Sequence, residues 1–76
     1  GMNKAMQAYS AGDYKAAHDL FKQEGNAGNA EACYQLGLML STGKGSVAKN
    51  TLQAKVWLKK AVSLGHPDAQ TALSNL

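Results

Sequence analysis

The sequence repeats itself at an offset of 37 residues, and this repetition constrains the fold more than any other feature. Residues 20–28 (LFKQEGNAG) align with residues 57–65 (WLKKAVSLG). Repetition at a period of roughly 20 to 50 residues is typical of proteins that stack copies of one supersecondary unit. The other matches fall mainly on small and apolar positions: Ala17 with Ala54, Lys22 with Lys59, Ala32 with Ala69 and Leu36 with Leu73.

The two copies differ in the loop that connects their helices. Ser10 aligns with Ser41 at an offset of 31, so the second copy contains an insertion of six residues (37 − 31 = 6) within residues 41–50, STGKGSVAKN. The first copy makes the same connection with only AGD, at residues 11–13. The segment 41–50 is therefore predicted to join two helices, and its two glycines are expected to supply positive φ angles for the turn.

Apolar residues follow the period of an α-helix throughout the chain. They recur at spacings of three and four, which places them on one face of a helix, and no segment alternates with the period of a strand. Residues suited to N-caps, helix ends and a first helical turn stand between these segments: Asn29 and Asn50, then Gly12, Gly25, Gly43 and Gly65, then Pro67. The pattern predicts an all-α fold with helices at residues 3–10, 14–24, 30–41, 51–64 and 67–75.

Length and composition indicate one globular domain with a thin core. A chain of 76 residues buries only about 60 to 65% of the surface that its unfolded form exposes. Its apolar content of 45% is that of a globular protein, and its longest apolar run, LGLML, is far too short to cross a bilayer. We expect no membrane association and a cytoplasmic location, unless a signal peptide has been removed.

The positive charge lies in the second half of the chain. Residues 1–37 hold three lysines and four acids, for a net charge of −1, whereas residues 38–76 hold five lysines and one acid, for +4. All eight cations are lysines, while surfaces that bind nucleic acid commonly use the planar fork of arginine. A solvated lysine face is therefore favoured over a nucleic-acid interface.

The short motif GKGS, residues 43–46, does not form a nucleotide-binding loop of the Walker kind. That loop requires the spacing G-x-x-x-x-G-K-[ST] between a strand and a helix, so that backbone N–H groups converge on the phosphates. Here the spacing is different, and an amphipathic helix is predicted where the strand would stand. We expect no nucleotide and no other cofactor.

The residues that could carry catalysis or metal chemistry are scattered. Cys33 lies on an apolar helical stripe and is expected to be a buried packing residue. His18 is expected on an exposed helical face and His66 in a hydrogen-bonded turn, and neither has the partners of a metal site. The five acids are spread over predicted helix surfaces, so we expect that the protein is not an enzyme.

The segment from Ala30 to Ala69 carries a set of motif residues: Ala32, Leu36, Gly37, Gly43, Gly45, Val47, Ala54, Trp57, Lys60, Ala61 and the run Gly65-His66-Pro67-Asp68-Ala69. On these residues it resembles the Sel-one-like repeat, the SLR branch of the tetratricopeptide family. The resemblance implies an α-α superhelix of two helical hairpins followed by a C-terminal capping helix. Residues 3–28 would form a shorter tetratricopeptide-like pair, residues 29–65 the Sel-one-like repeat, and residues 66–76 the first helix of an incomplete repeat.

The pattern also has a packing logic of its own. Gly37, Ala54 and Ala61 are small where the helices of the pair are expected to cross most closely. Trp57 and Leu58 are expected to fill the space between successive pairs.

The resemblance implies a scaffold that binds a protein or peptide partner on its concave surface, which the first helix of each pair would line. Tyr34 and Leu38 could instead pack between neighbouring helices. Two other functions stay open: a self-associating structural module or fragment of a longer solenoid, and an accessory domain that binds cell-wall glycan. The matching concave positions are Met6, Tyr9, Ser10, Glu31, Tyr34, Leu38, Ser41 and Thr42.

The last predicted helix carries a stripe of apolar residues that needs a cover. The stripe consists of Ala69, Ala72, Leu73 and Leu76. Part of it is expected to pack on the preceding helix. The rest of the stripe would stay uncovered in an isolated chain. We therefore expect either a two-fold homodimer that buries Leu73 and Leu76 or continuation into further repeats.

Overall fold

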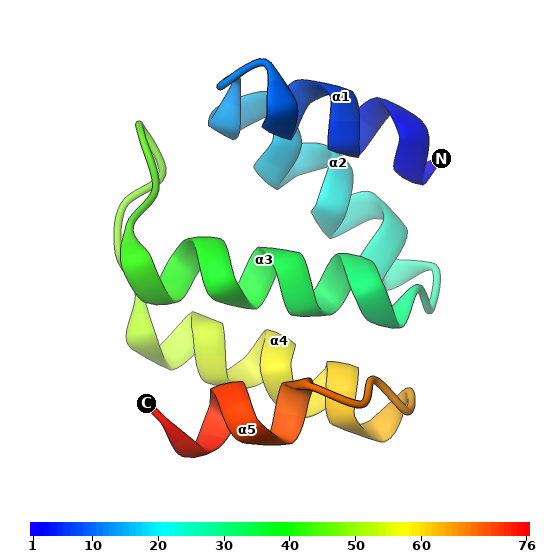
Figure 1. The fold of residues 1–76 in the computed structure, drawn as a ribbon, viewed down its shortest axis with the longest axis vertical. Coiled ribbons are helices and arrows are strands. Elements are labelled where there is room, and N and C mark those ends of the chain that lie inside the picture. The colour runs from blue at the N-terminus through cyan, green and yellow to red at the C-terminus, as the bar shows by residue number, and fades with distance from the viewer.

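The computed structural model describes residues 1–76 and confirms the all-α prediction, because it contains five α-helices and no strand (Figure 1). The observed helices differ from the predicted ranges by one or two residues at most of their ends. They are α1 (Met2–Ser10), α2 (Tyr14–Asn26), α3 (Ala30–Thr42), α4 (Thr51–Ser63) and α5 (Ala69–Ser74).

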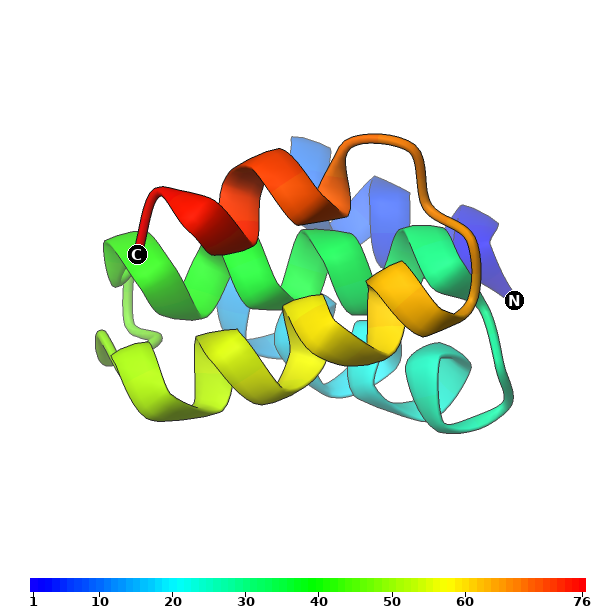
Figure 2. The ribbon, with the colours of Figure 1, turned by 90° about the horizontal axis from the view of Figure 1, so that it is seen from below.

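The helices form two layers. In Figure 2, α1, α3 and α5 lie on the upper side, and α2 and α4 lie below them. Each helix packs against the next one in the chain, so α3 contacts both α2 and α4, and α5 rests on α4. The outer faces of α3 and α5 therefore lie on the same side of the molecule. None of the five helices has the length and apolar character that crossing a bilayer requires.

Side-chain caps start three of the helices. Asn29 Oδ1 accepts a hydrogen bond from Ala32 N at 3.0 Å, and Asn50 Oδ1 accepts one from Gln53 N at 3.0 Å, as predicted for N-cap residues. Asp13 caps α2 in the same way. These bonds satisfy backbone donors that have no partner within the helix, and they fix where α2, α3 and α4 begin.

One predicted helix end was wrong. Gly25 lies inside α2, and Gly28, with φ +96°, makes the turn after that helix. The reason is a close approach of three helices, because a β-carbon at position 25 would lie 3.0 Å from both Cys33 Sγ and Trp57 Cζ3. Gly25 is therefore a packing glycine, which the spacing of apolar residues did not distinguish from a helix-ending glycine.

The start of α5 was also predicted too early. Pro67 precedes the helix, which begins at Ala69. The backbone N–H of Asp68 donates to His66 Nδ1 at 3.1 Å, and this bond holds residues 66–68 in a turn ahead of the helix.

The core runs through both layers and joins the two hairpins. Trp57, only 9% exposed, packs against Gly25 of α2 and so fills the space between successive pairs, as predicted. Leu58 lies at the crossing of α3 and α4, against Gly37. Cys33 is fully buried, as predicted. Other fully buried residues include Ala5, Ala17, Phe21, Ala32, Leu36, Ala54, Ala61 and Ala69.

The loop between α3 and α4 packs against the first hairpin. Gly43 and Gly45 have φ angles of 70° and 57°, as predicted for this turn. A β-carbon at position 45 would lie 2.5 Å from Tyr14 Cδ2, so only glycine allows the loop to approach α2 this closely. Lys44 Nζ lies 5.7 Å from the centre of the Tyr9 ring and 5.8 Å from that of Tyr14. The loop therefore contacts both hairpins.

Candidate functional site

A groove of about 470 Å³ lies between α3 and α5. Its α3 wall consists of Tyr34, Leu38 and Ser41, three of the eight residues predicted to face a partner. The opposite wall is formed by α5 and the residues that cap its two ends. It consists of Asp68, Thr71, Ala72 and Asn75.

An aromatic stack lies next to the groove and involves Tyr34, one of its lining residues. The rings of Tyr34 and His66 lie nearly parallel, with their centroids 4.1 Å apart and an angle of 19° between their planes. The His66 side chain is only 7% exposed and Tyr34 is half-buried, so the histidine ring is largely removed from water. It connects α3 directly to the turn that precedes α5, and it holds the Tyr34 ring in one orientation.

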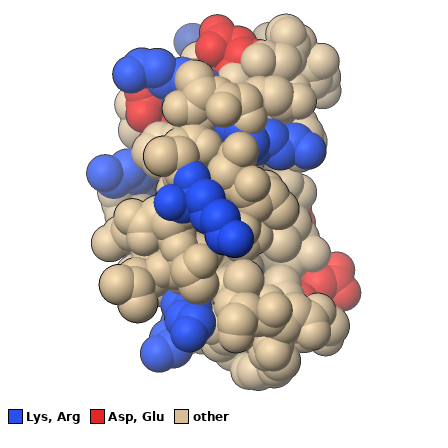
Figure 3. All heavy atoms as spheres, turned by 90° about the vertical axis from the view of Figure 1, so that its left-hand side faces the viewer, with Lys and Arg blue, Asp and Glu red and all other residues tan.

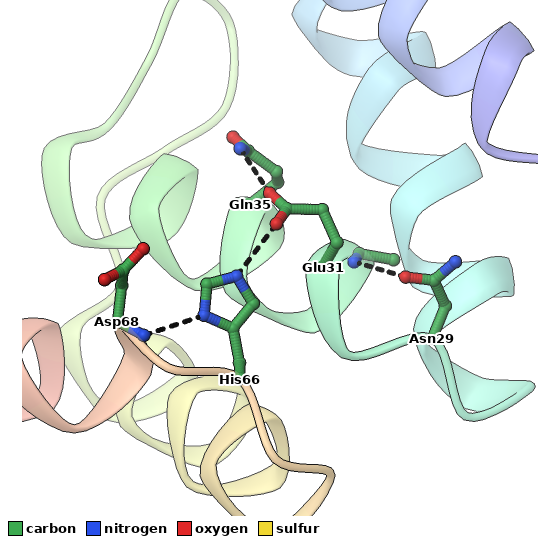
Figure 4. A network of polar contacts seen from close by, with 6 residues as sticks. Asn29, Glu31, Gln35, His66 and Asp68 are labelled. Atoms are coloured by element: carbon green, nitrogen blue, oxygen red, sulfur yellow. Dashed lines mark hydrogen bonds and ion pairs between the residues drawn. The ribbon is translucent and has the colours of Figure 1, made fainter.

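The hydrogen bonds of His66 define its tautomer. Nδ1 accepts from the backbone N–H of Asp68, so this nitrogen carries no proton. The proton lies on Nε2, which donates to Glu31 Oε1 at 2.8 Å (Figure 4). His66 is thus a hydrogen-bonded turn residue, as predicted, and it also connects two helices.

Glu31 extends the network along α3. Its second carboxylate oxygen, Oε2, accepts a hydrogen bond from Gln35 Nε2 at 2.8 Å. Figure 4 shows the chain of contacts from Gln35 through Glu31 and His66 to the backbone of Asp68. Both oxygens of Glu31 therefore have partners within the protein, and the network sets the distance between α3 and the start of α5.

The hydroxyl groups near the end of α3 are also engaged. Ser41 Oγ and Thr42 Oγ1 both donate to the carbonyl oxygen of Leu38, at 2.8 and 3.0 Å. The oxygen of Ser41 keeps lone pairs that can accept a hydrogen bond from a ligand. Thr42 is exposed but does not line the groove.

The predicted residues of α1 lie elsewhere. Met6 and Ser10 line a separate cavity of about 510 Å³ on α1. Tyr9 packs edge-on against Tyr14 and Phe21, at centroid distances of 5.4 and 6.2 Å, and is half-buried. The groove therefore contains three of the predicted α3 residues and none of the predicted α1 residues.

A third cavity, of about 320 Å³, lies between α2 and the loop at residues 43–50. Its walls include Lys15, His18, Lys49 and Asn50. His18 is half-buried there rather than exposed as predicted, and its Nδ1 lies 3.1 Å from Asp19 Oδ1. Figure 3 shows the side of the molecule that carries this loop, with lysine side chains spread over it and few acidic ones.

The only cysteine, Cys33, is in an environment that disfavours a reactive thiolate. Burial raises the pKa of the Cys33 thiol, and the positive charge of Lys60 offsets only part of this effect. Its Sγ donates weakly to the carbonyl oxygen of Gly25 at 3.6 Å. A nucleophilic cysteine needs an accessible thiolate, which this environment disfavours. No three His, Cys, Asp or Glu side chains lie close enough together to hold a metal ion.

Sequence reasoning placed His66 in a turn but did not identify it, or the α5 residues, as part of a site. One signal was present, because the offset of 37 aligns His66 with Asn29, the N-cap of α3 (29 + 37 = 66). Both residues accept a hydrogen bond from a backbone N–H shortly after them, at Ala32 and at Asp68. The stack on Tyr34 has no sequence signal, because it depends on how the hairpin folds back.

Comparison with protein families identifies the segment that builds most of this site. Residues 30–66 match the family model for the Sel1 repeat, a range that spans α3, the loop, α4 and His66. Curated proteins gave no match, and neither did solved structures. Sel1 repeats are generally non-catalytic modules for protein–protein interaction. The chain is therefore a helical-repeat protein with a Sel1 repeat at residues 30–66, consistent with the Sel1-like branch of the tetratricopeptide-like superfamily.

Proposed function

We propose that the chain is a non-catalytic interaction module that holds a peptide segment of a partner protein in the groove between α3 and α5. The observation that carries this proposal is the meeting of Tyr34, Leu38 and Ser41 in one cavity with residues of α5. These three residues lie on the first helix of the Sel1 repeat, and the general role of such repeats in protein interaction supports a partner there.

The chemistry of the groove suits a peptide. Leu38 and Ala72 offer apolar contact, while Ser41, Thr71 and Asn75 offer side chains that can pair with main-chain amides. Binding sites of this kind combine apolar surface with a few placed polar groups.

The groove is also held in shape before binding. The Tyr34–His66 stack and the Glu31–His66 hydrogen bond fix α3 relative to the start of α5. A wall that is already ordered loses less conformational entropy when it binds a ligand.

Selection from a random peptide library, displayed on phage and panned against the immobilised chain, tests the proposal. Peptides that enrich are synthesised, and their dissociation constants are measured by fluorescence anisotropy. Leu38→Ala removes the apolar contact of α3 and is expected to weaken binding about tenfold. Val56→Ala is the matched control, since Val56 is an exposed aliphatic residue on α4 that does not line the groove.

Two results would contradict this function. One is that no peptide enriches over a bare support. The other is that the enriched peptides bind Leu38→Ala as tightly as they bind the wild type. Circular dichroism of each variant shows that the fold is intact, so that a change in binding can be assigned to the groove.

A further inference from the structure

We infer that the segment bound between α3 and α5 carries a positively charged side chain, preferably arginine, that pairs with the carboxylate of Asp68. This inference rests on the proposed function, because it concerns the ligand of the same groove. It specifies the chemistry of the partner.

The surface formed by α3, α5 and the turn before α5 carries no positive side chain, whereas lysines and acids are mixed on the first hairpin. The chain as a whole is positive, with a net charge of +3, yet α3, α5 and the turn before α5 contain no lysine. The charged residues of these segments are Glu31 and Asp68, both acidic. The lysines lie on α1, α2, the 43–50 loop and α4, at positions 4, 15, 22, 44, 49, 55, 59 and 60.

Asp68 is the carboxylate in the groove that remains free. Its backbone N–H is bonded to His66, but its side chain forms no hydrogen bond or ion pair within the protein (Figure 4). Glu31 differs in this respect, because Gln35 and His66 already occupy its two oxygens. Asp68 is exposed and lines the groove, so a cation on a ligand can reach it.

The end of α3 adds negative potential to the same groove. The groove extends to Ser41 in the last turn of α3, where the helix dipole places partial negative charge. That last turn contains no basic residue to compensate it. The nearest lysine in sequence, Lys44, lies over the rings of Tyr9 and Tyr14 in the first hairpin.

Arginine suits this site better than lysine. The guanidinium group offers parallel N–H donors that match the two oxygens of a carboxylate, and it sheds water more readily than an ammonium group. Because Asp68 is exposed, the pair is partly screened by water, and we expect its effect on affinity to be modest.

The test uses a peptide selected on the wild-type chain that is sensitive to Leu38→Ala. It is synthesised in two forms, one with its basic residue and one with glutamine at that position. Each form is titrated into the wild type, Asp68→Asn and Asp19→Asn. Asp19→Asn is the matched control, because it makes the same change of charge on α2, away from the groove.

We expect the basic peptide to bind Asp68→Asn about fivefold more weakly than the wild type, and to bind Asp19→Asn almost unchanged. The glutamine form should bind the wild type and Asp68→Asn equally. Added salt should weaken the basic peptide and leave the glutamine form nearly unaffected.

The inference is overturned if peptides that depend on Leu38 carry no basic residue, or if Asp68→Asn binds the basic peptide as tightly as the wild type. In both cases the groove would still bind peptides, so the proposed function would survive. If no peptide enriches, or if binding does not depend on Leu38, the proposed function fails and this inference fails with it.

Discussion

Gly37 of α3 and Leu58 of α4 meet where the two helices of the Sel1 repeat cross. A β-carbon at position 37 would lie 2.7 Å from Leu58 Cγ and 2.8 Å from Leu58 Cδ2. Leu58 is fully buried, so its side chain has no free space into which it could move. The distance between α3 and α4 therefore depends on the absence of a side chain at position 37.

Gly37→Ala is expected to destabilise the protein by about 1 to 3 kcal/mol, because the overpacking outweighs the higher helix propensity of alanine. Urea unfolding followed by circular dichroism measures the change. In Gly37→Ala/Leu58→Ala the clash is removed, so the double variant should lose less stability than the sum of the two single losses. Strictly additive losses would show that the two residues do not limit the crossing.

His66→Ala is expected to lower the free energy of unfolding by about 2 to 3 kcal/mol, since it removes both the ring stack on Tyr34 and two hydrogen bonds. His66→Phe keeps an aromatic ring but no hydrogen-bonding nitrogen, and it should lie between His66→Ala and the wild type. The melting temperatures of the three proteins, measured by thermal unfolding, give the order of their stabilities. A melting temperature of His66→Ala equal to that of the wild type would refute a connecting role for this residue.

The buried thiol of Cys33 predicts a loss of stability at alkaline pH. Burial raises its pKa in the folded protein above the ordinary value of 9.0. Above that value the unfolded chain releases the thiol proton while the folded chain keeps it, so the free energy of unfolding falls as pH rises toward the folded-state pKa. At pH values below the ordinary pKa, the thiol is protonated in both the folded and the unfolded chain, and its full contribution to the free energy of unfolding is present.

The measurement compares urea unfolding of the wild type and Cys33→Ala at about pH 7 and about pH 10.5. Lysines and tyrosines titrate in both proteins, so the difference between them isolates the thiol. The wild type should lose more stability than Cys33→Ala over this range. An identical pH dependence would show that the thiol titrates normally in the folded protein.

The loop at residues 43–50 is expected to bind neither ATP, GTP nor inorganic phosphate. Four of its backbone N–H groups are bonded within the protein: those of Gly43 and Lys44 donate to Met39 O, that of Val47 to Lys44 O and that of Asn50 to Leu40 O. These four donors are not available to an external anion, and the loop follows an α-helix instead of the strand that precedes a phosphate loop. Calorimetric titration should show no saturable heat, whereas micromolar binding that Lys44→Ala abolishes would disprove this prediction.

Self-association through α5 stays a prediction of the sequence. Ala69 is buried, Ala72 and Leu73 are half-buried, and Leu76 is 39% exposed, so part of the apolar stripe remains available. Sedimentation velocity should detect a two-fold dimer that the double variant Leu73→Glu/Leu76→Glu dissociates. A wild type that sediments as a monomer at high micromolar concentration would rule out this dimer.

The helices could be predicted from the sequence because their signals are local. Apolar spacing, the caps at Asn29 and Asn50 and the glycines of the loop each act within a few residues. Gly25 was misjudged because its role depends on Cys33 and Trp57, which come close only in the folded protein.

The groove was predictable only in part, for the same reason. Tyr34, Leu38 and Ser41 were predicted through the resemblance to the Sel-one-like repeat, and all three line the groove. The contributions of His66 and Asp68 depend on how the chain turns back after α4, which no periodic pattern encodes. Met6, Tyr9 and Ser10, predicted for the same concave surface, lie on α1, and Met6 and Ser10 line a different cavity.

The contact of Lys44 and Gly45 with the tyrosines of the first hairpin has a consequence for arrays of such units. The inserted loop packs against the neighbouring hairpin. The angle between successive hairpins therefore depends on this loop as well as on the buried core. Lengthening or shortening this loop would alter the curvature of the array without touching any helix. The insertion is thus a place where the geometry of a repeat array can change while each repeat keeps its own core.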